Sequence, residues 1–149
     1  LDPALDDGIE DDVVAFLRAR VAEAEARGVD AERIVLDPGP DFGKTPHQTV
    51  RVLRDLPRLV ALGHPVLLAV SRKDFVGAVT GRPPRERGAG TLAALAHGVD
   101  AGARILRVHD VADAADFLAV RAALRGDVEV PSEARLAEHL LRGPQGGAV

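Results

Sequence analysis

The chain has 149 residues, a length that suits one ordinary domain with a real core. Hydrophobic residues make up 46% of it and charged residues 28%, which is the composition of a globular rather than a disordered protein. The net charge of −4 argues against a general nucleic-acid binder, and the absence of cysteine excludes disulfides, thiol chemistry and zinc knuckles. Because the sequence shows no signal peptide and no apolar run near the length of a membrane span, we expect a cytoplasmic protein that does not act at a membrane.

Helices and strands are predicted to alternate along the chain. Apolar residues that recur at helical spacing predict five helices, at residues 9–27, 45–62, 75–79, 91–100 and 111–125. Short apolar runs predict three strands, at residues 34–36, 66–70 and 104–109. Thr45 and Pro46 suit the start of the second helix, and Pro57 should kink or split it, because proline removes a backbone donor and clashes with the preceding turn. A helix after each strand, without hairpin signals, predicts a parallel sheet with right-handed crossovers.

Three strand–helix units make only part of an α/β domain, either the edge of a doubly wound sheet or the last third of a barrel. This domain is expected over residues 1–126, with an acidic entry loop at residues 1–8. Residues 127–149 are expected to form a linker, a short helix from Ser132 to Leu141 and a mobile tail. Because the chain contains no methionine, we expect it to be a segment of a longer one.

Each predicted strand ends in polar side chains. They are Asp37 after the first strand, Ser71, Arg72 and Lys73 after the second, and Arg107 and His109 at the third. Because the carboxyl ends of parallel strands meet at one edge of a sheet, we expect these side chains to converge on one cleft. A carboxylate can accept two adjacent N–H donors, and the cations suit phosphate or diphosphate.

The same residues also have purely structural interpretations. Asp37 could cap a turn, and Arg72 with Lys73 could be a solvated charge pair at the start of a helix. His109 and Asp110 could form an ordinary helix N-cap region. Each residue alone fits the structural interpretation, but three strand ends that all carry such groups favour a composite site.

Two other patterns do not fit the sites that they suggest. The segment GPDFGKT resembles a phosphate-binding P-loop, but only three residues separate Gly39 from Gly43, where that motif has four. The five histidines lack metal-binding spacing such as HExxH, so a metal site made by the protein alone is not expected. The basic run RPPRER, at residues 82–87, is predicted to be a solvated loop.

Several short motifs together resemble the C-terminal part of dihydropteroate synthase. They are DPG at residues 37–39, FGK at 42–44, SRK at 71–73, AGTLA at 89–93 and RVHDV at 107–111. Their order and spacing match over residues 9–125. The resemblance implies an α/β fold, a (β/α)8 TIM barrel of the pterin-binding type, of which this chain supplies the sixth to eighth βα units. The first five strands and their loops would lie outside the chain.

The resemblance implies a transferase of folate biosynthesis. A dihydropteroate synthase condenses 6-hydroxymethyl-7,8-dihydropterin pyrophosphate with p-aminobenzoate and releases pyrophosphate. Fixed cations stabilise the negative charge that builds up as pyrophosphate departs. The catalytic residues that the resemblance implies are Lys73, Arg107 and His109. The implied substrate-binding residues are Asp37, Phe42, Lys73, Arg107 and His109.

The resemblance also implies a role for each residue. Asp37 would bind the N–H and amino groups of the pterin ring, and Lys73 would reach that ring from the other side. Arg107 would stack on the pterin and, with His109, hold the pyrophosphate, while Phe42 would lie near the aminobenzoate. Mg²⁺ would bind through the pyrophosphate, with its protein ligand in the N-terminal part outside this chain. A homodimer is also implied.

Two acidic residues depart from the family pattern. Asp41 stands where the family usually has glycine, and Asp74 stands where it has serine or threonine. In the family that hydroxyl, at a helix N-terminus, helps to receive the carboxylate of p-aminobenzoate. A helix N-terminus favours one negative charge, so a second carboxylate beside it would be repelled. The alternative function is therefore a pterin-binding paralogue without synthase activity. With its sheet edges open, the isolated chain is expected to be inactive and poorly stable.

Overall fold

The computed structural model describes residues 8–141, so most of the predicted entry loop and the predicted mobile tail lie outside the described residues. The chain divides into two compact units, residues 1–114 and 115–149, and each is considered by itself. The domain boundary that the sequence predicts at residue 126 stays a prediction. Among the described residues, no helix combines the length and the apolar character needed to cross a membrane.

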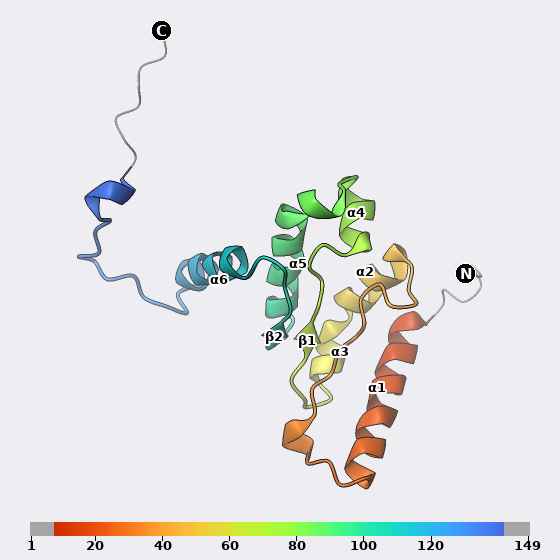
Figure 1. The fold of residues 1–149 in the computed structure, drawn as a ribbon. Coiled ribbons are helices and arrows are strands. Elements are labelled where there is room, and N and C mark those ends of the chain that lie inside the picture. The colour runs from red at the N-terminus through yellow and green to blue at the C-terminus, as the bar shows by residue number, and fades with distance from the viewer. Residues whose placement is uncertain (1–7, 142–149) are drawn as a thin grey trace. The chain divides into compact units, whose positions relative to one another are not determined.

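Helices and parallel strands alternate through the first unit, as the sequence predicts (Figure 1). Its helices are α1 (Ile9–Ala26), α2 (Pro46–Arg54), α3 (Leu56–Val60), α4 (Asp74–Thr80) and α5 (Gly88–Asp100). Its strands are β1 (Leu67–Leu68) and β2 (Ile105–Leu106), and its 3-10 turns are η2 (Ala31–Arg33) and η3 (Pro84–Glu86). Helix α6 (Val111–Arg125) begins in the first unit and continues into the second, which also holds the turn η4 (Glu138–Leu140).

The strands lie in chain order and run parallel. Leu67 pairs with Ile105, and the first predicted strand is reduced to one parallel bridge between Leu36 and Val66. The bridge is held by the Leu36 N–H, which donates to the Pro65 carbonyl over 2.9 Å, and by the Leu67 N–H, which donates to Leu36 over 2.7 Å. It does not lengthen because prolines stand on both sides of it, at 38 and 65, and proline donates no ladder hydrogen bond.

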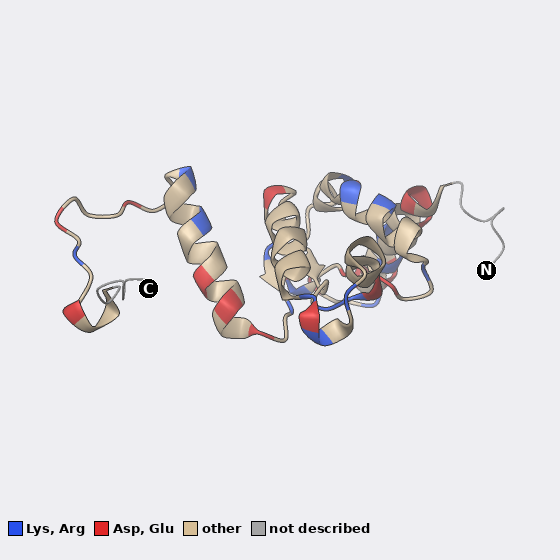
Figure 2. Cartoon of the chain, turned by 90° about the horizontal axis from the view of Figure 1, so that it is seen from above, with Lys and Arg blue, Asp and Glu red and all other residues tan. Residues whose placement is uncertain are grey.

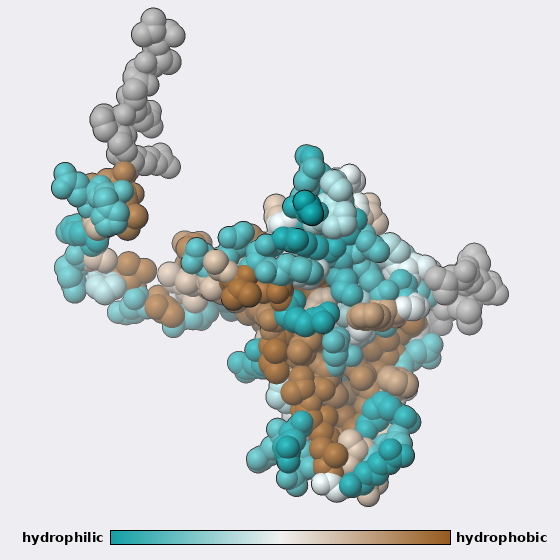
Figure 3. Space-filling model, viewed as in Figure 1, coloured by the Kyte–Doolittle hydropathy of each residue, from teal (hydrophilic) through white to brown (hydrophobic). Residues whose placement is uncertain are grey.

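One face of the strands is packed and the other is open. Leu36 and Leu68 are buried against helices, and α2, α3 and α5 lie behind the strands in Figure 1. On the opposite face Val35 is 45% exposed and Ile105 is 39% exposed. This open face forms a continuous hydrophobic surface over the strands (Figure 3). A closed barrel buries such a face with the side chains of its other strands, so the open face is what part of a barrel presents.

The predicted second helix is split rather than bent. Helix α2 ends at Arg54, Asp55 follows, and α3 carries Pro57 in its first turn. The break precedes the proline because a first-turn N–H has no partner within the helix, so proline is tolerated there. The predicted start is also confirmed: the Thr45 hydroxyl accepts the Gln48 N–H over 3.2 Å, and the Gln48 side chain accepts the Thr45 N–H over 2.9 Å.

The predicted helix from Ser132 to Leu141 is wrong. Only the 3-10 turn η4 forms there, and the Ser132 hydroxyl donates to the Glu133 carboxylate over 3.1 Å instead of capping a helix. Every residue from 126 to 141 is exposed, so no apolar face is packed against another element. Short helices gain most of their stability from such packing.

Gly98 lets α5 approach the sheet closely. A Cβ built at this position would overlap Leu68 Cδ2, and Leu68 is completely buried in β1. We therefore expect Gly98→Val to lower the free energy of unfolding of the full-length protein by about 3 kcal/mol, because the fixed core cannot move aside. Chemical denaturation measures the change. Gly88→Ala is the matched control in the same helix, since a Cβ there meets nothing within 4 Å. Equal stability of the two variants would contradict the close approach.

Candidate functional site

A cleft of about 790 Å³ opens at the carboxyl ends of the strands in the first unit. Its charged lining residues are the cations Arg72, Lys73, Arg85 and Arg107 together with His109, and the acids Asp41 and Asp74. Figure 2 looks onto this end of the unit and shows basic and acidic segments in its loops. The strand ends thus meet at one cleft, as the parallel order requires.

Two of the predicted site residues do not line this cleft. Asp37 directly follows the Leu36 bridge, and its carboxylate accepts the Gly39 N–H over 2.8 Å, the turn contact of the structural interpretation. Phe42 is 66% exposed, and its ring stands beneath Lys73, whose ammonium lies 4.2 Å from the ring centroid. Lys73 therefore connects the first strand end to the cleft through a cation–π contact.

Arg72 adopts an unusual backbone conformation at the end of β1. Its φ of 58° lies in the left-handed region, which a residue with a side chain occupies only when its surroundings hold it there. The Arg72 N–H donates to the Thr91 hydroxyl over 3.0 Å, and its guanidinium binds both oxygens of Asp110 at 2.7 and 3.0 Å. The contact with Asp110 joins the ends of β1 and β2, and the contact with Thr91 joins the end of β1 to α5.

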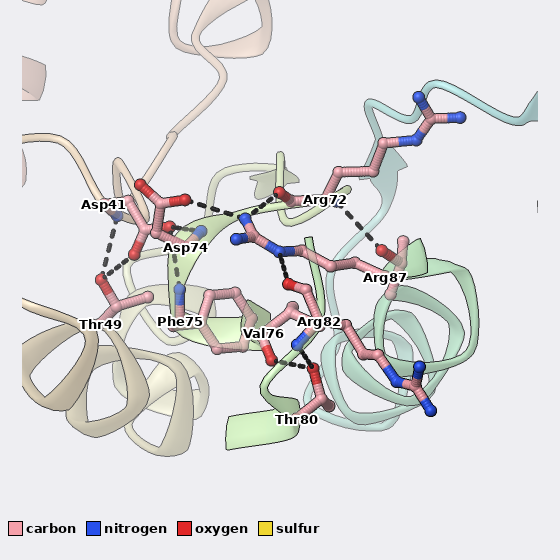
Figure 4. Close-up of polar contacts among 10 residues, drawn as sticks. Asp41, Thr49, Arg72, Asp74, Phe75, Val76, Thr80, Arg82 and Arg87 are labelled. Carbon is pink, nitrogen blue, oxygen red and sulfur yellow. Dashed lines mark hydrogen bonds and ion pairs between the residues drawn. The ribbon is translucent and has the colours of Figure 1, made fainter. Parts of the chain in front are cut away.

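Asp41 places a carboxylate on the first amides of α4 (Figure 4). One oxygen accepts the Asp74 N–H over 2.6 Å and the Phe75 N–H over 3.3 Å. The other oxygen accepts the Thr49 hydroxyl over 2.8 Å, and the Asp41 N–H donates back to that hydroxyl oxygen over 3.0 Å. A backbone φ of 61° at Asp41 allows this arrangement. Asp41 therefore fastens the loop after the first strand to both α2 and α4.

Asp74 is also engaged within the protein. Its carboxylate, 80% exposed, accepts a hydrogen bond from Arg87 over 2.8 Å, whereas the Arg87 side chain is only 11% exposed. Arg87 further donates to the carbonyls of Arg72 and Arg82, each over 2.9 Å (Figure 4). The carboxylates of Asp41 and Asp74 thus already occupy the first amides of α4 and the Arg87 guanidinium, which itself does not line the cleft.

Lys44 braces the turn between Asp37 and α2. Its ammonium donates to the carbonyls of Gly39 over 3.0 Å and Phe42 over 3.3 Å. Burial lowers the pKa of Lys44, and the nearby carboxylates of Asp37 and Asp41 act in the opposite direction. Lys44 thus fixes the loop that carries these two acids.

The arginines of the loop between α4 and α5 are the residues that the sequence analysis missed. The run at 82–87 is predicted to be solvated, but Arg85 lines the cleft and Arg87 is nearly buried. Of the features in the sequence, only the predicted topology could have identified these arginines. The loop comes after the short helix α4, which itself follows the carboxyl end of β1, so the loop lies beside the cleft. Residue type alone does not separate the exposed Arg82 from Arg87.

No group of three or more histidine, aspartate or glutamate side chains that could hold a metal occurs among residues 8–141. The Mg²⁺ that the resemblance implies, bound through a diphosphate, stays a prediction.

The fold and the cleft define a class of protein. Parallel strand–helix units with one open sheet face, and a cleft at the strand ends that carries several cations, are what part of a (β/α)8 barrel presents. The chain belongs to the pterin binding enzyme family, whose sequence model matches residues 3–109.

Comparison with known proteins narrows this family to the dihydropteroate synthases and their inactive second copies. The dihydropteroate synthase of Neisseria meningitidis serogroup C is 46% identical over 109 residues, 72% of this chain and 38% of that enzyme. The inactive dihydropteroate synthase 2 of Mycobacterium tuberculosis is 42% identical over 119 residues, 80% of this chain and 37% of that protein. The solved dihydropteroate synthase of Xanthomonas albilineans with 7,8-dihydropteroate matches with a TM-score of 0.78 and 44% identity, over 84% of this chain and 47% of that one.

The resemblance to the C-terminal part of dihydropteroate synthase and the barrel fold are therefore confirmed. The chain spans less than half the length of these relatives. The matches include both synthases and inactive second copies, so they establish the family but not the reaction.

Proposed function

We propose that the full-length protein binds 6-hydroxymethyl-7,8-dihydropterin pyrophosphate in this cleft but does not condense it with p-aminobenzoate. Lys73 and Arg107 support the binding half of the proposal. Among the described residues neither has a carboxylate partner, and both line the cleft, so their charge is available to a ligand. In this proposal Arg107 and His109 hold the diphosphate in the cleft, Lys73 binds the pterin ring, and the ring reaches beyond the cleft lining to Asp37.

The second half of the proposal, that condensation does not occur, rests on one observation. The Asp41 carboxylate accepts the N–H groups of Asp74 and Phe75. The protein's own side chain takes the place of an acidic ligand at the start of α4. The Asp74 carboxylate occupies Arg87 in the same way. An aromatic acid that approaches the start of α4 would meet two carboxylates, and the amides there are already hydrogen-bonded.

A second candidate is the synthase reaction itself, in which the amine of p-aminobenzoate displaces pyrophosphate. The synthases among the relatives, at up to 46% identity, favour it. In that reaction Lys73, Arg107 and His109 would stabilise the departing pyrophosphate, with Mg²⁺ carried on it, and Phe42 would lie against the aminobenzoate.

Calorimetry and a product assay on the full-length protein test the proposal. We expect the pterin pyrophosphate to bind, and Arg107→Ala to weaken it about 100-fold, because a guanidinium lost from a diphosphate site removes charge-assisted hydrogen bonds. Arg104→Ala is the matched control, since Arg104 is also exposed at β2 but does not line the cleft. We expect no dihydropteroate from the two substrates. Turnover would establish the synthase instead, and absence of pterin binding would overturn both candidates.

A further inference from the structure

A serine and a histidine from neighbouring strand ends share two hydrogen bonds inside the cleft. Ser71 follows β1, is 6% exposed and lines the cleft, and His109 follows β2. The Ser71 Oγ lies 2.9 Å from His109 Nδ1. The same oxygen accepts the backbone N–H of His109 over 3.2 Å. Ser71 therefore contacts both the ring and the backbone of one residue.

Counting hydrogens fixes the role of each atom. A serine hydroxyl has one hydrogen to donate and can accept others. If the Ser71 hydrogen points at Nδ1, then Nδ1 is the acceptor and the hydrogen of the neutral ring is on Nε2. If Nδ1 carried the hydrogen instead, Ser71 Oγ would accept twice and its own hydrogen would have no acceptor among the described residues. Leaving a nearly buried donor without a protein acceptor is unfavourable, so the arrangement in which Ser71 donates to Nδ1 is the preferred one.

We propose that Ser71 is a positioning residue that makes His109 a permanent hydrogen-bond donor to an anion in the cleft. In the neutral ring Nε2 carries the only ring hydrogen. In the protonated ring Nδ1–H donates to Ser71, and Nε2 again carries a hydrogen. Nε2 thus presents N–H to the cleft in both protonation states and never presents a lone pair.

This assignment distinguishes the pair from a nucleophile and its base. In such a dyad a third group orients the histidine through its other nitrogen. Among the described residues no carboxylate contacts His109 Nε2, and the neighbouring Asp110 is bound to Arg72 instead. Ser71 is also nearly buried, whereas an attacking hydroxyl must reach its substrate. The pair suits the binding of a phosphate oxygen, and to that extent it rests on the proposed function.

Nuclear magnetic resonance of the full-length protein tests the tautomer directly. Long-range ¹H–¹⁵N spectra, with His109→Gln to assign the signals, should show only the Nε2–H form of the neutral ring. Ser71→Ala should produce a mixture of tautomers, and Ser71→Thr, which keeps the hydroxyl, should restore the single form. Thr91→Val is the matched control, because it removes another buried hydroxyl, one bonded to Arg72 instead of His109.

Binding of inorganic pyrophosphate gives the second measurement. We expect Ser71→Ala to weaken it about five- to tenfold and Ser71→Thr to leave it within about twofold of the parent protein. A neutral ring with hydrogen on Nδ1, or an unchanged tautomer in Ser71→Ala, overturns the inference. So does a changed tautomer with unchanged pyrophosphate affinity. If these results hold but the pterin pyrophosphate does not bind, the proposed function fails and the positioning role of Ser71 stands.

Discussion

Replacing Asp41 by glycine and Asp74 by serine together is expected to strengthen p-aminobenzoate binding to the full-length protein by about ten- to hundredfold. Asp41→Gly frees the N–H groups of residue 74 and Phe75, which now bind the Asp41 carboxylate at 2.6 and 3.3 Å. Asp74→Ser frees Arg87 and supplies a hydroxyl at the start of α4. Hydrogen bonds to a charged group are worth about 1.5–3 kcal/mol, which sets this range.

The two single variants distinguish repulsion of the ligand by the Asp74 carboxylate from occupation of the α4 amides by the Asp41 carboxylate. Asp74→Ser removes a carboxylate but leaves the α4 amides occupied, so we expect it to give only part of the gain. Asp41→Gly also removes a cap, which costs about 1 kcal/mol of stability, while glycine tolerates the φ of 61° better. Unfolding curves for each variant keep this change apart from the change in affinity.

Calorimetry with p-aminobenzoate, in the presence of inorganic pyrophosphate, measures the expected gain. The matched control is Asp30→Asn with Glu32→Gln, which removes two exposed acids near η2, outside the cleft. If this control raises the affinity equally, general charge and not the α4 end is responsible. If the Asp41 and Asp74 double variant binds no better than the parent protein, the argument from the two acids is wrong.

The sequence predicts the order of elements because each depends on local patterns. Apolar spacing predicts α1, Thr45 with Pro46 predicts the start of α2, and Pro57 predicts the break before α3. Parallel order then follows, and with it the convergence of Ser71, Arg107 and His109 on one cleft. These predictions need only chain direction and short-range geometry.

Local sequence patterns do not predict contacts between distant loops. The sequence marks Asp41 as a charge that repels a ligand, but it does not show that this carboxylate reaches α4, 33 residues further along the chain. It does not separate Arg87 from Arg82, because the difference lies in which carbonyls surround each guanidinium. The roles of Asp37 and Phe42 stay predictions, since both lie outside the cleft lining and await a bound ligand.

Arg87→Ala is expected to lower the free energy of unfolding of the full-length protein by about 3 kcal/mol. The nearly buried guanidinium joins the carbonyls of Arg72 and Arg82 to the Asp74 carboxylate, and its loss leaves these acceptors unpaired. It also packs against the backbone of Gly77, where an added Cβ would overlap it, so truncation opens a void. In the variant, Arg72, whose φ is 58°, also loses the hydrogen bond that its carbonyl accepts from Arg87.

Denaturant unfolding measures this loss, and two comparisons locate its source. Arg82→Ala, on the same loop, removes an exposed pair with Glu86 and should change stability by less than about 1 kcal/mol. A double-mutant cycle of Arg87→Ala with Asp74→Ala should give a coupling below about 1 kcal/mol, because the Asp74 side chain is 80% exposed. Most of the loss must then come from the two carbonyls and the void. A coupling near the full 3 kcal/mol would instead make the ion pair the source and would contradict the bracing role of Arg87.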